Sequence, residues 1–151
     1  GLCSSEDARE IQQLLEKFCD IGELFDGYRL FSQRIQSEER EQNYSSRVVK
    51  VIRFIRKNYE KDISVGDAAQ ILGLNGEYLN KIFKKETGES FSRYLTQVRM
   101  EKAKELLEQT ALKNYEIAEK VGFSDPHYFG ISFKKMTGKT PTEYAREKRS
   151  L

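Results

Sequence analysis

The sequence predicts an all-α protein in which two helix-turn-helix units are joined by one long central helix and follow an N-terminal helical segment. Three observations support this fold class. The chain of 151 residues is 38% hydrophobic and 33% charged and contains only two prolines, as expected of a helical protein with a large polar surface. One phrase occurs twice, as FKKETG from Phe83 and as FKKMTG from Phe133. Apolar residues near the N-terminus follow a heptad pattern.

Residues 1–45 contain the heptad pattern. All of its a and d positions are apolar except Ser32, and the apolar ones are Ile11, Leu14, Phe18, Ile21, Phe25, Tyr28 and Ile35. Such a stripe is typical of a coiled-coil seam, so residues 8–36 are predicted to pair two copies of the chain or to transmit a signal. A helix that packs on a missing sensor or receiver domain, or on the rest of the chain, explains the stripe equally. The chain starts at Gly1, which favours a piece of a longer protein.

The repeated phrase belongs to a longer internal repeat. Seven residues between Tyr78 and Tyr94 recur 50 positions later, and Ala69 and Gly73 recur 49 positions later. Each copy has the pattern of a short helix, a turn at a glycine and a second helix, which is a helix-turn-helix. The predicted units occupy about residues 64–88 and 115–138.

The second helix of each unit has recognisable ends. Asn75 and Ser124 stand at the expected N-cap positions. Gly88 and Gly138 suit the left-handed residue that follows a helix.

The same two helices each have an inward and an outward face. Helical spacing predicts that Leu79, Ile82, Phe83 and Glu86 pack inward in the first copy, and Phe129, Ser132, Phe133 and Met136 in the second. The outward residues are Glu77, Asn80, Lys81 and Lys84, and His127, Gly130, Ile131 and Lys134, with Lys85 and Lys135 beside them. A lysine pair alone is usually a solvated helix face. Its recurrence in two matching frames favours a nucleic-acid-binding surface.

Residues 90–110 between the units carry one apolar stripe and are predicted to form a single amphipathic helix. A helix of roughly 20 residues is about 30 Å long, close to the roughly 34 Å of one turn of duplex DNA. The second helices of the two units are therefore expected to enter successive major grooves on one face of the duplex.

A terminal helix is predicted to begin after Thr140. Thr140 and Glu143 form a capping box, with Pro141 at the first helical position. The helix is expected to be structural, and its N-terminus near Thr140 would add a contact to a phosphate.

Charge and composition limit the function. Residues 1–45 carry 5 basic and 10 acidic residues, a net charge of −5, whereas residues 46–151 carry 21 and 14, a net charge of +7. The basic part indicates a polyanionic partner. With one histidine, His127, and two cysteines, Cys3 and Cys19, the sequence offers no catalytic triad, metal cluster or disulfide framework, so we expect no enzyme and no cofactor. No apolar run approaches the roughly 20 residues that span a membrane, and a reducing cytoplasm is expected.

The stretch GFSDPHYFGISFKKMTGKTPTEYA closely resembles the signature of the AraC/XylS family of bacterial transcription regulators. The resemblance covers residues 46–150. It implies seven helices, homeodomain-like units, and binding to double-stranded promoter DNA that recruits or adjusts RNA polymerase, as an activator does. By position it places base reading on Glu77, Asn80, Lys81 and Lys84, and on His127, Gly130, Ile131 and Lys134.

The chain departs from the family pattern at Gly130 and Ile131, where the family often has a small hydroxyl residue followed by Arg. Neither side chain donates a hydrogen bond to a base edge, although Ile131 can touch a thymine methyl group. The first unit is therefore expected to carry most direct base readout, and the second to anchor phosphates and respond to DNA shape.

The alternative function is a helical adaptor that binds an acidic protein.

Overall fold

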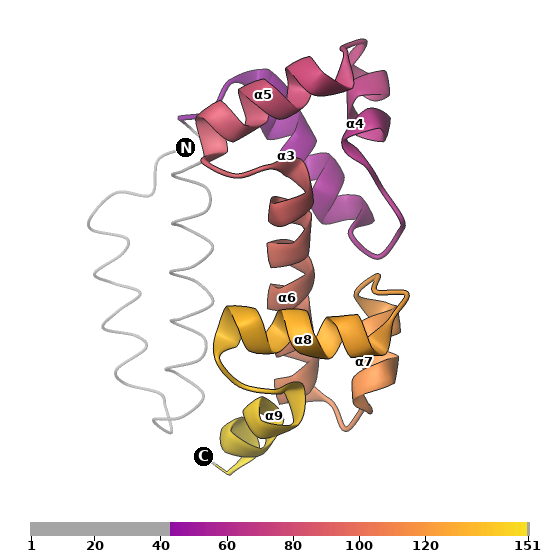
Figure 1. Ribbon diagram of the computed structural model, residues 1–151, viewed down its shortest axis with the longest axis vertical. Coiled ribbons are helices and arrows are strands. Elements are labelled where there is room, and N and C mark those ends of the chain that lie inside the picture. Colours follow the sequence, from indigo (N-terminus) through magenta and orange to yellow (C-terminus); the bar gives the residue numbers. More distant parts are fainter. Residues whose placement is uncertain (1–42, 151) are drawn as a thin grey trace, which may run out of the picture. The chain divides into compact units, whose positions relative to one another are not determined.

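Seven α-helices and no strand occur in residues 43–150, which are the residues that the computed structural model describes (Figure 1). The helices are α3 Ser46–Asn58, α4 Val65–Leu72, α5 Gly76–Thr87, α6 Phe91–Gln109, α7 Asn114–Lys120, α8 Pro126–Thr137 and α9 Pro141–Arg149. The predicted all-α class is confirmed. The predicted pairing segment, residues 8–36, lies outside the described residues.

Two separate groups of buried side chains form the hydrophobic core from Tyr44 onward. The first joins α3, α4 and α5 to the start of α6, and the second joins α7 and α8 to the rest of α6. Helix α6 contributes Phe91 and Leu95 to the first group and Met100, Ala103 and Leu107 to the second. The predicted central helix is therefore a structural member of both units.

The repeated phrase has the same structural role in both units. Phe83 is fully buried and meets the ring of Tyr94 edge-on, with ring centroids 5.4 Å apart, and Phe133 meets Tyr144 at 5.5 Å. At the end of the phrase, the Thr87 and Thr137 hydroxyls donate to the carbonyls of Phe83 and Phe133, both at 2.8 Å. Gly88 and Gly138 then adopt φ of 82° and 80°, the left-handed conformation predicted for them.

The start of α5 is as predicted, but the start of α8 is not. The Asn75 side chain accepts hydrogen bonds from the backbone N–H groups of Glu77 and Tyr78. In the second unit the cap is Asp125, whose Oδ1 accepts from the N–H of His127 at 2.8 Å, and the prediction of Ser124 was wrong. Pro126 occupies the first helical position, which its fixed φ favours, so the residue immediately before it becomes the cap.

The inward faces of α5 and α8 differ at their last positions. Leu79, Phe129 and Ser132 are buried as predicted, but Met136 is 45% exposed and its predicted inward position was wrong. Met136 lies in the last turn of α8, beyond the buried core residue Phe133. At the matching place in α5, the carboxylate of Glu86 accepts a hydrogen bond from the backbone N–H of Ser45 at 2.8 Å.

Candidate nucleic-acid interface

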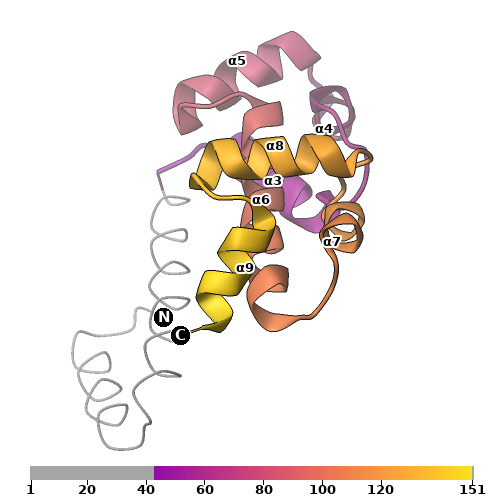
Figure 2. The ribbon, with the colours of Figure 1, turned by 60° about the horizontal axis from the view of Figure 1, so that its bottom comes forward.

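Helix α5 lies at the start of α6 and α8 crosses its second half (Figure 1), and α5 and α8 run in similar directions in both views (Figures 1 and 2). Each follows the short first helix of its unit, α4 or α7, and leads into the next helix, α6 or α9. Helix α6 has 19 residues and is therefore about 28 Å long. The two second helices thus belong to units that pack on the two halves of one continuous helix.

In the first unit, the outward positions of α5 form an exposed, mainly basic surface. The side chains of Glu77, Lys81, Lys84 and Lys85 are exposed. Asn80 is half-buried instead, because its Oδ1 accepts a hydrogen bond from the backbone N–H of Phe91 at 3.2 Å. Because one lone pair of its oxygen is engaged there and the oxygen is directed toward the start of α6, Asn80 is best placed to offer a ligand its amide N–H groups.

In the second unit, the predicted positions on α8 form an exposed surface with a gap in the middle. His127, Lys134 and Lys135 are exposed, and Ile131 is 54% exposed. Between them, a Cβ added to Gly130 would have no atom within 4 Å. This surface combines charge at its C-terminal end with an apolar side chain and a bare stretch of helix.

Tyr78 and Tyr128 are two further exposed residues of α5 and α8, with exposed fractions of 47% and 60%. They are not among the residues predicted from the sequence. Their recurrence at the offset of 50 is the signal that identifies them. A tyrosine here presents both a ring and a hydroxyl group to solvent, so each can contact a sugar or a phosphate.

Thr140 begins α9 with the predicted capping box. Its Oγ1 accepts from the N–H of Glu143 at 3.2 Å, and its own N–H donates to Oε2 of Glu143 at 2.8 Å. The bond from the backbone N–H of Thr140, followed by a bond from its side chain to the carboxylate, holds the pKa of the Glu143 carboxyl below its usual value. Both polar groups of Thr140 are therefore engaged within the helix start, beside a carboxylate that repels a phosphate. The geometry gives Thr140 a structural role.

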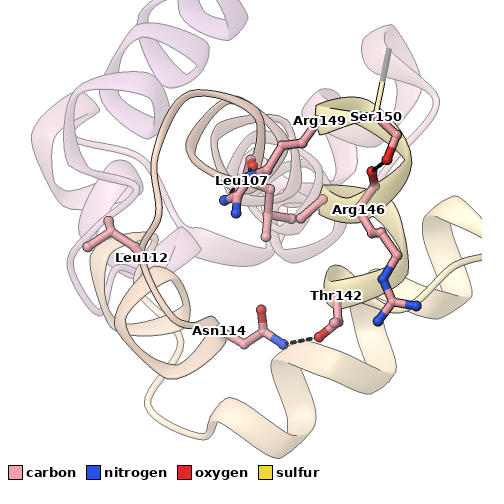
Figure 3. A pocket seen from close by; sticks show the side chains of 8 residues that line it. Leu107, Leu112, Asn114, Thr142, Arg146, Arg149 and Ser150 are labelled. Atoms are coloured by element: carbon pink, nitrogen blue, oxygen red, sulfur yellow. Dashed lines mark hydrogen bonds between the residues drawn. The ribbon is translucent and has the colours of Figure 1, made fainter.

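A hollow of about 420 Å³ lies where α6, α7 and α9 meet (Figure 3). Nδ2 of Asn114 donates to Oγ1 of Thr142 at 2.9 Å, and Arg149 donates to the carbonyls of Leu107 and Thr110. These polar groups bind one another across the hollow, so it belongs to the packing of α9.

Other kinds of site can be judged for the described part of the chain. Within residues 43–150, no three His, Cys, Asp or Glu side chains gather closely enough to hold a metal ion. None of the helices in that range is long and apolar enough to cross a membrane.

The fold and its two exposed second helices define a helix-turn-helix DNA-binding protein. Residues 68–147 match the family model of the helix-turn-helix domain. The chain belongs to the AraC/XylS family of transcription regulators, as its motifs predicted. This is a family of DNA-binding regulators rather than of enzymes, which confirms the expectation that the chain is not an enzyme.

Three relatives illustrate the similarity. The transcriptional regulatory protein YesN of Bacillus subtilis is 49% identical over 82 residues, which are 53% of this chain and 22% of YesN. The lactose operon transcription activator of Staphylococcus xylosus is 38% identical over 91 residues, 60% of this chain and 33% of the activator. The solved C-terminal domain of AraT, a response regulator from Geobacillus stearothermophilus, is 40% identical with a TM-score of 0.66, and the match covers 68% of this chain and 86% of that domain. The chain spans less than half the length of the curated relatives that it matches first.

Proposed function

We propose that the chain is the promoter-binding part of a longer regulator, and that α5 and α8 enter successive major grooves on one face of a DNA duplex. The observation that carries this proposal is the length of α6. The two exposed helices belong to units that pack on different halves of a helix of about 28 Å, and one turn of duplex measures about 34–36 Å. A helix of this length spaces the two units on the scale of two adjacent grooves.

The exposed side chains divide into two proposed roles. In the first unit, Lys81 and Glu77 lie on the outward face near the N-terminal half of α5 and are the best candidates to read base edges, and Asn80 contributes its amide N–H groups. In both units, the lysine pairs stand one to two turns further along and contact phosphates; they are Lys84 and Lys85, and Lys134 and Lys135. Phosphate contacts fix register and orientation, whereas base contacts determine sequence.

The second unit is proposed to contribute less direct readout. His127 and Ile131 are its outward side chains near the bases, and Ile131 offers an apolar contact to a thymine methyl group. The bare helix surface at Gly130 lets the groove floor approach closely. We expect this half-site to be selected mainly by groove shape, and the other half-site mainly by hydrogen bonds.

The remainder of the regulator is proposed from its relatives. Because AraT is a response regulator, a receiver domain before this chain is one candidate for the missing part. We propose further that residues 8–36 pair two chains, that the bound protein contacts RNA polymerase, and that it acts on promoter DNA in the bacterial cytoplasm.

The test is selection of bound duplexes from a random library by the 151-residue chain, followed by titration of the selected duplex against salt. We expect two short motifs about one helical turn apart, and a steep fall of affinity with salt because lysines displace counterions from phosphates. Tight binding without enrichment of any motif would contradict sequence-specific reading. Failure to bind any duplex at low salt would favour the adaptor that binds an acidic protein.

A further inference from the structure

Arg99, in the middle of α6, connects the two units through its guanidinium group. Its Nε donates to the carbonyl of Tyr59 and its Nη2 to that of Lys61, both at 2.8 Å. Tyr59 and Lys61 lie just after α3 in the first unit. The same guanidinium lies over the ring of Phe123, 5.6 Å from its centroid, and Phe123 belongs to the core of the second unit. One side chain thus binds both units at once.

Gly122 brings the backbones of the two units into close contact at the same place. It has φ of +90°, and a Cβ on it would lie 2.5 Å from the carbonyl oxygen of Tyr59 and 3.0 Å from Nε and Nη2 of Arg99. Its counterpart in the repeat, Gly73, also has positive φ, but a Cβ there would meet nothing within 4 Å. Both turns favour glycine for their backbone conformation, but only Gly122 is also required by contact with the other unit.

Arg149 is the counterpart of Arg99 in the repeat, 50 positions later, and its contacts show which interactions of this arginine are common to both copies. It donates to the carbonyls of Leu107, at 3.2 Å, and Thr110, at the end of α6. In each unit, an arginine of the later helix therefore binds carbonyls at the end of the earlier one. The partners of Arg149 lie within the second unit, whereas Arg99 adds the Phe123 ring and the Gly122 turn across the boundary.

The boundary between the units has little else to fix its geometry. The two groups of buried side chains share no residue. Beside Arg99 the units leave an open cleft of about 470 Å³, lined by Asp62, Thr96, Asp125 and Tyr128 among others. Long helices are rarely straight and curve gently, so a continuous helix alone does not fix the angle between the elements packed along it. The contacts of Arg99 and Gly122 join the two units directly across their boundary and can fix that angle.

We propose that Arg99 and Gly122 form a clamp that fixes the angle between the two helix-turn-helix units and thereby sets the spacing of the two DNA motifs that the chain accepts. This inference rests on the proposed function of α5 and α8 as the two reading helices. Inserting two base pairs between the motifs rotates one relative to the other by about 70°, because a turn contains about 10.5 base pairs. A fixed pair of helices cannot follow that rotation, whereas a pair joined only by a bending helix follows part of it.

The test compares dissociation constants for the selected duplex and for duplexes with one or two base pairs inserted or removed between its motifs. Wild type, Arg99→Ala, Arg99→Lys and Arg149→Ala are measured in the 151-residue chain. Arg149→Ala is the matched control, because it removes the same charge and the same kind of bond to carbonyls. We expect Arg99→Ala to reduce the discrimination against altered spacing roughly tenfold, since two charge-assisted hydrogen bonds are lost. Arg149→Ala should discriminate against altered spacing as strongly as wild type. Arg99→Lys should discriminate less than wild type but more than Arg99→Ala, because an ammonium group lacks the planar, two-donor geometry of a guanidinium.

Gly122→Ala and Gly73→Ala form a second matched pair. Both place a Cβ on a residue with positive φ, but only Gly122→Ala forces the two units apart. Gly122→Ala is expected to change the preferred spacing or reduce the discrimination, and Gly73→Ala is expected to keep both. This pair decides the question even if Arg99→Ala does not fold.

A distance measurement tests the clamp without DNA. Spin labels on Lys85→Cys and Lys135→Cys, with Cys3→Ser and Cys19→Ser, report the separation of α5 and α8. A narrow distribution that broadens with Arg99→Ala but not with Arg149→Ala supports the clamp. The clamp is overturned if the distance distribution stays narrow in Arg99→Ala and this variant also discriminates against altered motif spacing as strongly as wild type. If the distance distribution broadens as expected but wild type itself shows no spacing preference, Arg99 does fix the angle between the units, and the proposed function fails together with the role of that angle in motif spacing.

Discussion

The side-chain oxygen of Asn80 accepts a hydrogen bond from the backbone N–H of Phe91 at 3.2 Å, so α5 holds the first residue of α6. Fifty residues later, the same two positions are occupied by Gly130 and Pro141. Glycine has no side chain to accept this bond, and proline has no N–H to donate it. The acceptor and the donor are absent together, so the second unit is left with no unpaired group at this place. The departure at Gly130 thus has a structural counterpart at Pro141.

Asn80 is therefore predicted to act in both stability and binding, and two substitutions separate these roles. Asn80→Ala leaves the N–H of Phe91 without its acceptor and should lower the free energy of unfolding by about 1–3 kcal/mol. Asn80→Asp keeps an acceptor but removes the amide donor and adds a negative charge to α5. It should retain most of the stability and still bind DNA more weakly. Urea unfolding and duplex titration measure the two effects, and an alanine variant as stable as wild type would contradict the structural role.

Lys81 and Lys135 are predicted to differ in their effects on sequence preference. Lys81→Ala should cost about 1–3 kcal/mol on the selected duplex and relax the choice of base at one position. Lys135→Ala should weaken binding to all duplexes alike and reduce the salt slope by about 1. Lys104→Ala is the charge-matched control, because Lys104 pairs with Glu101 on α6 at 2.8 Å. Equal, sequence-independent losses from Lys81→Ala and Lys135→Ala would overturn the division into base-reading and phosphate-binding residues.

Gly130→Ala is predicted to stabilise the protein. Gly130 lies inside α8 without positive φ, and an added Cβ meets no atom within 4 Å, so alanine should raise the free energy of unfolding by about 0.5–1 kcal/mol. Gly138→Ala is the control. Its surroundings are equally open, but its φ of +80° disfavours a Cβ, and stability should fall. Chemical denaturation of both variants measures the difference. A loss with Gly130→Ala would show that the middle of α8 is not as open as described.

The capping boxes of α4 and α9 predict a loss of stability in acid. The hydroxyl and N–H of Ser64 donate to Asp67, and the groups of Thr140 bind Glu143, which lowers the pKa of both carboxyls from ordinary values of 3.8 and 4.5. Since the folded pKa values are the lower ones, their stabilisation is complete above the ordinary values. It is lost as the pH falls through the folded values.

The measurement is urea unfolding between about pH 6 and pH 3, for wild type and for Asp67→Asn with Glu143→Gln. The double variant should be less stable at the upper end, and the two curves should converge at the lower end. Parallel curves over the whole range would show that these carboxyls do not contribute to stability through their pKa.

Much of the fold could be predicted because each element carries a local signal. The repeated FKKETG/FKKMTG motif combines an aromatic core residue, a threonine whose hydroxyl binds a carbonyl of the last turn, and a glycine that adopts positive φ. Its two copies therefore identify the C-terminal ends of two helices. The wrong N-cap arose because Ser124 and Asp125 are both good caps, and the proline after them decides between them. Met136 was misplaced because helical spacing gives a direction but not the point at which a core ends.

The contacts of Asn80, Arg99 and Gly122 could not be predicted in the same way. Each joins residues from different elements, and each has a backbone group among its partners, which has no signature in the sequence. The offset of 50 pairs Arg99 with Arg149 and Tyr78 with Tyr128, and this is the signal from which such positions can be found. Their different surroundings in the two units appear only in the structure.

Hydroxyl-radical footprinting of the selected duplex, bound by the 151-residue chain, tests the central proposal most directly. If α5 and α8 enter successive major grooves, the backbone should be protected in two patches on one face of the duplex, about 10–10.5 base pairs apart. Lys84→Ala with Lys85→Ala should weaken one patch, and Lys134→Ala with Lys135→Ala the other. A single patch, or one that both double variants weaken equally, would contradict an account in which the two units bind separate grooves.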